Sequence, residues 1–251
     1  MGLLKKDTFI CLDCEATGLD PEKDRCIEVA AIKFTFDALL GEMETLIDPE
    51  QEIPEASIEI HHITQEMVQG KPRIRDVLPE LFDFIGDHVV VGHGIGYDIS
   101  LINAEAARFD LPQQLKASRS IDTLRLARLY GQAPTNSLES LRQHFNVAAE
   151  GAHRARNDVI VNIEVFKHLT RDFKTTQDIF KVLSKPVLLK RMPLGKHKGR
   201  DFRDIPVEYL RWAAHKDFDQ DLLYSIRSEL KRRKSGTTFS QAGNPFANLE
   251  I

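Results

Sequence analysis

Hydrophobic and polar residues first alternate and then take up helical spacing along this chain. Residues 9–19 (FICLDCEATGL) begin as an apolar run, and residues 25–36 and 43–47 are rich in strand-forming side chains. Turn residues separate these three segments, so we expect a meander of antiparallel strands. Short apolar runs at 88–91 and 120–124 predict two further strands.

Most of the segments between and after these strands show the apolar spacing of amphipathic helices. The predicted helices cover residues 58–69, 73–85, 97–109, a segment ending at Tyr130, 137–145 and 159–169. A chain that begins with strands and then alternates helices with strands predicts an α/β fold, with a mixed sheet flanked by helices.

Pattern and composition divide the chain into four parts. We expect a large α/β domain over residues 1–173, a linker with one short helix over 174–186, and a small basic domain over 187–234. About fifty residues can bury only a small core. Residues 235–251 are rich in Gly, Ser, Asn and Thr, which predicts a disordered tail.

The composition is that of an ordinary globular protein, with 251 residues of which 42% are hydrophobic and 29% charged. No apolar run approaches the roughly eighteen residues of a membrane span, and no signal sequence opens the chain, so we expect a cytoplasmic protein without membrane contact. Cys11, Cys14 and Cys26 lack a second Cys pair for a zinc site and are interpreted as small buried residues in a reducing compartment.

The formal net charge of −4 is distributed unevenly. Residues 1–184 carry 20 Lys+Arg against 30 Asp+Glu, whereas residues 185–234 carry 14 against 7. This basic segment favours a polyanion partner: lysines flanked by glycines in residues 193–199 can reach phosphates, and Tyr209 or Trp212 can stack on bases. The alternative is that the aromatic residues form the small core and the lysines are only solvated.

Two carboxylates interrupt the first predicted strand. Side chains alternate along a strand, so Asp13 and Glu15 project from one face about 7 Å apart, close enough to share one ion. Apolar residues occupy both parities of this strand, which favours burial of both faces. Because buried carboxylates repel one another unless a cation lies between them, we predict a metal site. The alternative is an edge strand that turns its acids toward water.

Three more residues are candidates for the same cleft. Asp98 lies shortly after the predicted strand at 88–91, and His153 and Asp158 lie five positions apart at the start of a predicted helix. Each has an ordinary alternative: Asp98 can complement a helix N-terminus, His153 can cap a helix, and Asp158 can be solvated. Hard divalent ions prefer oxygen ligands, which agrees with a set of carboxylates.

In this order the residues resemble the DEDDh family of 3′–5′ exonucleases, which includes the proofreading epsilon subunit of bacterial DNA polymerase III and RNase T. The resemblance covers about residues 8–169. It departs from the family pattern at Gly94, where Asn is usual, and at His62, where Gly is usual. The matching segments are Asp13-x-Glu15 within DCEATGLD, His61-His62-Ile63-Thr64, Asp98 within VGHGIGYDISLI, Ile121-Asp122-Thr123-Leu124 and His153-x4-Asp158.

The resemblance implies a ribonuclease H-like fold and hydrolysis of terminal phosphodiesters with two Mg²⁺ or Mn²⁺ ions. The ions would be held by four carboxylates, those of Asp13, Glu15, Asp98 and Asp158. His153 would act as general base, since an imidazole with a pKa near neutrality can take a proton from water and lose it again.

The resemblance also points to substrate contacts beside the acids, at Ala16, Thr17, Leu19 and His61. Thr17 would donate a hydrogen bond to the terminal sugar or phosphate, and Leu19 would pack on the last base. The alternative is a tight turn with Leu19 in the core.

We therefore predict a metal-dependent 3′–5′ exonuclease that releases nucleoside 5′-monophosphates from single-stranded 3′ ends, with DNA favoured over RNA. One alternative is an exoribonuclease, and another is a non-catalytic nucleic-acid-binding module. A small domain that begins with a Gly-Lys-x-Lys-Gly turn accompanies some exonucleases of this family, and residues 192–212 are similar to it. The sequence has no polymerase signature of its own, so a proofreading role would need a polymerase or clamp partner on a second chain.

Overall fold

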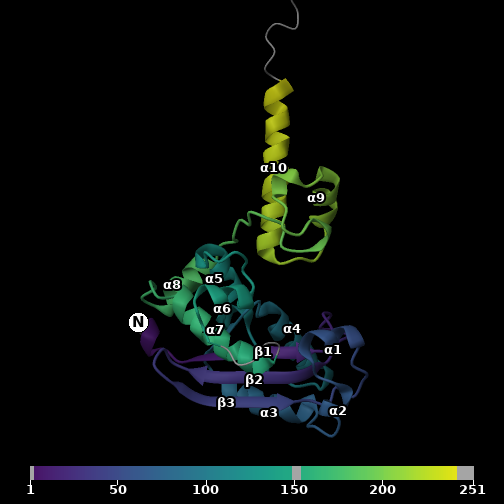
Figure 1. The fold of residues 1–251 in the computed structure, drawn as a ribbon, viewed down its shortest axis with the longest axis vertical. Helices are drawn as coiled ribbons and strands as arrows, with labels where there is room; N and C mark the ends of the chain where they lie inside the picture. Colours follow the sequence, from purple (N-terminus) through teal and green to yellow (C-terminus); the bar gives the residue numbers. More distant parts are fainter. Residues whose placement is uncertain (1–2, 149–153, 242–251) are drawn as a thin grey trace, which may run out of the picture. The chain divides into compact units, whose positions relative to one another are not determined.

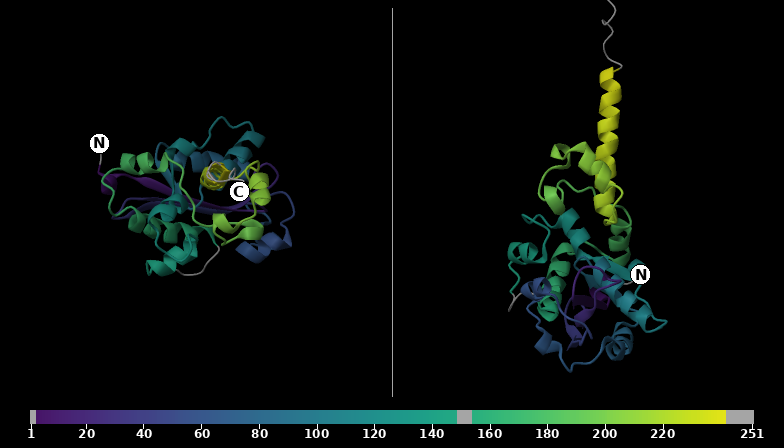
Figure 2. Two further views of the ribbon diagram at one scale, coloured as in Figure 1. Left: turned by 90° about the horizontal axis from the view of Figure 1, so that it is seen from above. Right: turned by 90° about the vertical axis from the view of Figure 1, so that its right-hand side faces the viewer.

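The computed structural model describes residues 3–148 and 154–241, with side chains through Ser235 (Figure 1). The chain forms two compact units, Met1–Leu183 and Ser184–Ile251. Figure 2 shows the same ribbon from two further directions. Each unit is described separately below.

A five-stranded mixed sheet forms the centre of the first unit. In chain order the strands are β1 (Phe9–Ala16), β2 (Cys26–Phe34), β3 (Leu39–Leu46), β4 (Val89–Gly92) and β5 (Ser120–Asp122). Their spatial order is β3-β2-β1-β4-β5, with β1, β2 and β3 antiparallel and β4 parallel to both β1 and β5. The predicted meander is present, and β1 is the central strand, which excludes an edge position for Asp13 and Glu15.

Helices pack on both faces of this sheet, as the fold class predicts. Figure 1 shows α5–α8 on one side of the strands and α3 on the other, and the two hydrophobic cores divide in the same way, with α4 contributing to the second. The helices are α1 (Glu55–His61), α2 (Gln65–Val68), α3 (Ile74–Ile85), α4 (Gly96–Arg108), α5 (Thr123–Tyr130), α6 (Leu138–His144), α7 (Ala155–Leu169) and α8 (Thr176–Leu183).

Aromatic rings fill the core between β1, β2 and α7. Phe9, Phe34, Phe36 and Phe166 form a cluster with ring centroids between 5.3 and 6.5 Å apart. Phe9 has the strand parity of Asp13, so the face of β1 that packs on these rings is also the face that carries the acids. The packing of α7 on β1 and β2 therefore fixes this helix over the acidic end of β1.

Two predicted segments differ from the structure. The expected linker contains α8, whose Ile179 and Leu183 are buried in the first core, because its apolar side chains share one helical stripe. The expected single helical region at 58–69 is two helices. Its break is at His62, which has left-handed backbone angles (φ 60°, ψ 19°) that end α1.

The second unit is a small helical fold. Its elements are the 3-10 turns η3 (Gly195–His197) and η4 (Phe202–Asp204) and the helices α9 (Val207–Ala213) and α10 (Gln220–Gln241). α10 continues past the predicted boundary at residue 234, and residues 242–251 lie outside the described part of the chain. The small core consists of Met192, Phe202, Ile205, Leu210, Ala213, Leu222 and Ile226.

Among residues 3–148 and 154–241, no helix is both long enough and apolar enough to span a membrane.

Replacing Phe166 by alanine tests the aromatic core. The substitution removes a fully buried ring that contacts three others, so we expect the free energy of unfolding to fall by about 3–5 kcal/mol. Urea denaturation followed by circular dichroism measures the change. Leu39→Ala is the control, because Leu39 is 55% exposed on β3, an edge strand, and its loss should cost little. Equal effects of the two substitutions would contradict this description of the core.

Candidate active site

Two elements bring three carboxylates together. Asp13 and Glu15 lie on one face of β1, and Asp158 lies in the first turn of α7. Oxygen atoms of these three side chains lie within 4.8 Å of one another, a spacing that suits oxygen ligands of a divalent cation. Figure 1 shows α7 beside β1 and β2, so residues far apart in sequence meet at one end of the central strand.

Asp98 reaches the same region from α4. Its side chain is 5% exposed, and its Oδ1 accepts a hydrogen bond of 2.9 Å from the backbone amide of Cys14, which lies between Asp13 and Glu15. Asp98 therefore does more than complement the dipole of its own helix. It is not part of the three-carboxylate set, although its charge acts on the other acids.

Burial and mutual repulsion perturb the acids strongly. Burial is the main cause that raises the pKa of Glu15 from its ordinary 4.5 to about 7, and the charges of Asp158 and Glu28 add to it. Burial likewise raises the pKa of Asp98 to about 7, and burial and then the charge of Asp98 raise the pKa of Asp13 well above its ordinary value. A bound divalent cation would relieve both effects, so the donor set fits such an ion.

His153, the predicted general base, lies outside the described residues. The description resumes at Arg154, which precedes α7 as its N-cap residue.

Glu28 is a residue of this region that the sequence interpretation missed. It lies on β2 opposite Glu15, is fully buried, and accepts hydrogen bonds from Arg154 Nη2 at 2.6 Å and from the backbone amide of Ala155 at 3.0 Å. These contacts hold the N-terminus of α7 against the sheet. A signal was available, because Glu28 is the one acid inside the apolar run of β2.

The turn after β1 is held by the hydroxyl of Thr17. Its Oγ1 donates to Asp24 at 3.1 Å and accepts from the amide of Arg25 at 3.0 Å and from Gln51 Nε2 at 2.9 Å. Because the hydroxyl proton is donated to Asp24, the predicted bond from Thr17 to substrate would require this hydrogen bond to break. Leu19 is 90% exposed, which excludes the alternative that it lies in the core.

Of the other predicted substrate contacts, Ala16 is buried at the end of β1 and His61 is buried at the end of α1. Nδ1 of His61 accepts a hydrogen bond of 3.0 Å from the amide of Ile63, so in the neutral ring Nε2 carries the proton. Among the described residues this buried Nε2 has no partner. Burial lowers the pKa of His61, which favours that neutral form.

The two departures from the family pattern share a backbone property. His62 has φ 60° and Gly94 has φ 75°, both in the left-handed region that Gly and Asn adopt most readily. The amide of Gly94 donates to Asp122, whose side chain also caps α5. Both positions therefore keep the conformation for which the family's usual residues are suited.

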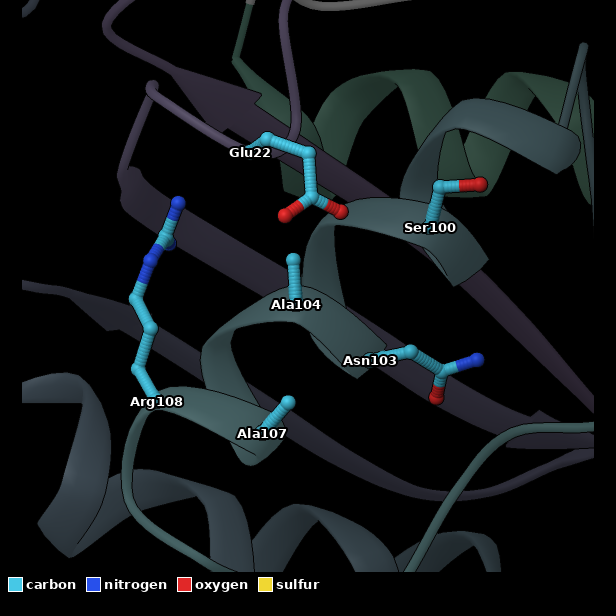
Figure 3. A pocket seen from close by; sticks show the side chains of 6 residues that line it. All are labelled: Glu22, Ser100, Asn103, Ala104, Ala107 and Arg108. Carbon is cyan, nitrogen blue, oxygen red and sulfur yellow. The ribbon is translucent and has the colours of Figure 1, made fainter.

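A hollow of about 540 Å³ lies apart from the acids (Figure 3). Five of its lining residues come from α4, and Glu22 closes it from the opposite loop. Three of its polar side chains are bonded within the protein: Ser100 donates to Gly96, Asn103 pairs with the backbone of Leu115, and Arg108 donates to Pro21. None of the predicted site residues lines it.

Comparison with known proteins agrees with this geometry. The RNase T family model, described as an exonuclease, matches residues 10–166, more than half of the chain. The chain is 33% identical over 190 residues to the DNA polymerase III epsilon subunit of Aquifex aeolicus, covering 75% of this chain and 91% of that protein. It is 32% identical over 195 residues to the PolC-type DNA polymerase III of Clostridium perfringens, of which it spans only 13%.

The fold is also that of a solved exonuclease. A structure of exonuclease X in complex with 5′-overhanging duplex DNA superposes with a TM-score of 0.57 at 22% identity, covering 69% of this chain and 98% of that one. The protein belongs to the RNase T exonuclease family, as its DEDDh pattern predicts, and its mixed sheet is of the ribonuclease H-like class. A second family model, provisionally described as a quorum-sensing-regulated virulence factor, matches residues 181–226 in the small unit.

The raised pKa values predict how stability depends on pH when no metal is bound. A carboxyl whose pKa is higher in the folded than in the unfolded chain stabilises the fold at low pH, and this contribution is lost as pH rises toward the folded value, here about 7. In EDTA, the melting temperature should therefore fall between about pH 5 and about pH 8, and Mg²⁺ or Mn²⁺ should reverse the fall. Glu15→Gln should show a smaller fall, and an identical profile would contradict the shift.

Glu28→Gln tests whether this residue positions α7. The amide keeps the size of the side chain but loses the charge that binds Arg154 and the amide of Ala155, so Mn²⁺ affinity should weaken by roughly 10-fold. Isothermal titration below the melting temperature measures it. Glu42→Gln is the matched control, since Glu42 is 53% exposed and pairs with Arg156 on the same helix. Equal affinities in both variants would refute the positioning role.

Proposed function

We propose that the protein is a metal-dependent 3′–5′ exonuclease that removes nucleoside 5′-monophosphates from single-stranded DNA ends. The observation that carries this proposal is the convergence of Asp13, Glu15 and Asp158 within 4.8 Å at the end of a central strand. Family membership supports the reaction class, and the presence of all four carboxylates argues against a non-catalytic binding module.

The residues at the site would have different roles in phosphodiester hydrolysis. Asp13, Glu15 and Asp158 would hold one Mg²⁺ or Mn²⁺, and Asp13 together with Asp98 would serve a second. When bound, the ions would activate the attacking water and stabilise charge on the phosphate oxygens. His153 would accept the proton of that water as general base, which requires the neutral imidazole. Glu28 and Arg154 would keep α7 in register with β1.

The turn after β1 would guide the 3′ end. Leu19 is exposed on a turn whose backbone is fixed by the bonds of Thr17, so it can pack on the terminal base without reordering the loop. We retain Leu19 and the neighbouring Ala16 as substrate contacts and assign Thr17 to the turn. His61 would offer the proton on its unpartnered Nε2 to the nucleotide.

DNA is the favoured substrate because the relatives described above are subunits or parts of DNA polymerase III. The same relationship supports a polymerase or clamp as a partner on a separate chain. An exoribonuclease with the same chemistry is the rival, because no described side chain reads the 2′-hydroxyl.

Digestion of 5′-labelled single-stranded DNA and RNA of one sequence tests the function. Wild type with Mg²⁺ or Mn²⁺ should give a ladder that shortens from the 3′ end, faster on DNA, and EDTA or Asp13→Ala should abolish it. Asp87→Ala is the control, since the Asp87 side chain is 99% exposed and its ion pair with Arg119 lies at the surface, away from the acidic cluster in sequence and in fold. Absence of cleavage with either metal would refute the proposal, and a faster ladder on RNA would favour the exoribonuclease.

A further inference from the structure

The small unit exposes aromatic rings beside lysines. Leu210 and Ala213 of α9 are buried in its core, whereas Trp212 is 51% exposed and Tyr209 is half-buried. Tyr209 and Trp212 lie three positions apart on α9, so they share one helical stripe, which lies next to the buried stripe of Leu210 and Ala213. Trp212 lies outside the small core, whereas Leu210 belongs to it and Tyr209 packs against it, so the alternative prediction is wrong for Trp212 and holds for the other two residues.

The rings and charges form one connected surface. His197 packs on Tyr209 with centroids 4.5 Å apart, Tyr209 packs on Trp212 at 5.3 Å, and Nζ of Lys216 lies 4.9 Å from the Trp212 ring. Exposed Lys196 and Lys198 flank the buried His197 in the loop. We call this set the Trp212 surface: Lys196, His197, Lys198, Tyr209, Trp212 and Lys216.

The loop that carries the two lysines is held in place. It is closed at its base by backbone hydrogen bonds from Met192 to Arg200 at 2.9 Å and from Gly199 to Met192 at 2.8 Å. Gly195 and Gly199 have φ of 71° and 82°, and a Cβ at Gly195 would lie 3.0 Å from the Tyr209 hydroxyl. Glycine at 195 therefore lets the loop approach the aromatic ring closely.

The local charge balance favours an anionic ligand. Among the described residues, neither Lys196 nor Lys198 makes an ion pair. Several acids of the unit are engaged elsewhere: Asp201 caps η4, Asp221 accepts from Val187, and Glu229 pairs with Arg232 and Arg233. The other exposed acids, Asp204, Glu208, Asp217 and Asp219, are outnumbered by the lysines and arginines of residues 185–234.

We infer that the Trp212 surface binds single-stranded nucleic acid, with a base stacked on Trp212 and phosphates on Lys196, Lys198 and Lys216. Aromatic rings between lysines suit a strand of alternating bases and phosphates, whereas an acidic peptide or an anionic membrane offers charge without stacked rings. The inference deepens the proposed function, because it gives the same class of substrate a second contact outside the acidic cluster. A strand held there would stay with the enzyme between cleavage steps.

Trp212 is the one tryptophan of the chain, so its fluorescence reports this surface directly in the full-length protein. Oligodeoxythymidylate titrated in EDTA, where metal-dependent cleavage is prevented, should quench the fluorescence saturably. Replacing both Lys196 and Lys198 by alanine should weaken binding and reduce the slope of log affinity against log salt by about 1.4, since each phosphate contact on a single strand contributes about 0.7. Lys231→Ala, an exposed lysine of α10 outside the surface, is the matched control.

Anisotropy of a labelled oligonucleotide measures the stacking contribution. Trp212→Ala should weaken binding roughly 10-fold or more, Trp212→Phe should retain most of it, and Tyr224→Ala should have no effect, since Tyr224 is an exposed aromatic residue outside the surface. Circular dichroism verifies that each variant is folded. If Trp212→Ala does not fold, the comparison of Trp212→Phe with wild type still measures the stacking contribution.

Three results would overturn the inference. The first is an unchanged fluorescence while anisotropy shows that the oligonucleotide binds, and the second is equal binding by Trp212→Phe and Trp212→Glu. The third is quenching by polyglutamate or by phosphatidylglycerol vesicles without quenching by the oligonucleotide. Because these titrations need no metal or cleavage, they separate the inference from the proposed function. Quenching without any cleavage activity would support the inference and refute the proposed exonuclease activity. Cleavage without quenching would support the exonuclease activity and refute the inference.

Discussion

The stability of the first unit depends on how the negative charges at the end of the buried strand β1 are compensated. Asp13 and Glu15 project from β1 toward α7, Glu28 faces Glu15 from β2, and Asp98 is tied to the backbone of Cys14. Such a cluster destabilises a fold unless its members are paired or bind a cation. Arg154 pairs with Glu28, whereas burial is the main cause that raises the pKa values of Glu15 and Asp98, and a bound cation would offset it.

Helix α7 contributes both to the hydrophobic core and to the candidate metal site. Its first turn carries Asp158, its N-terminus is held by Glu28, and Phe166, further along the helix, completes the aromatic core. The aromatic packing determines the position of the helix axis, and the Glu28 contacts determine where the helix begins against the sheet. A change in either set therefore alters the distance between Asp158 and the acids of β1, which explains how residues without metal contacts can affect the site.

The two units carry opposite charge, and this bears on a polyanionic substrate. Residues 1–184 have 30 acids against 20 basic residues, so the unit with the candidate active site repels a nucleic acid strand at long range. Bound cations reduce this repulsion locally. The basic small unit provides attraction of the opposite sign, and the Trp212 surface adds a ring for stacking. Binding and cleavage can therefore be distributed over different parts of the chain. Salt would then weaken binding by the small unit, whereas removal of metal would abolish cleavage at the acidic cluster.

The sequence by itself determined the strand meander and the mixed α/β class, because strand alternation and helical spacing depend only on neighbouring residues. It placed Asp13 and Glu15 on one face of the first strand, in agreement with their convergence on Asp158. Tertiary structure alone decided that Glu28 anchors α7, that the Thr17 hydroxyl belongs to the turn, that residues 176–183 join the first core and that Trp212 is exposed. Each of these depends on contacts between residues distant in sequence, or on which stripe of a short helix finds a partner, and local pattern contains neither.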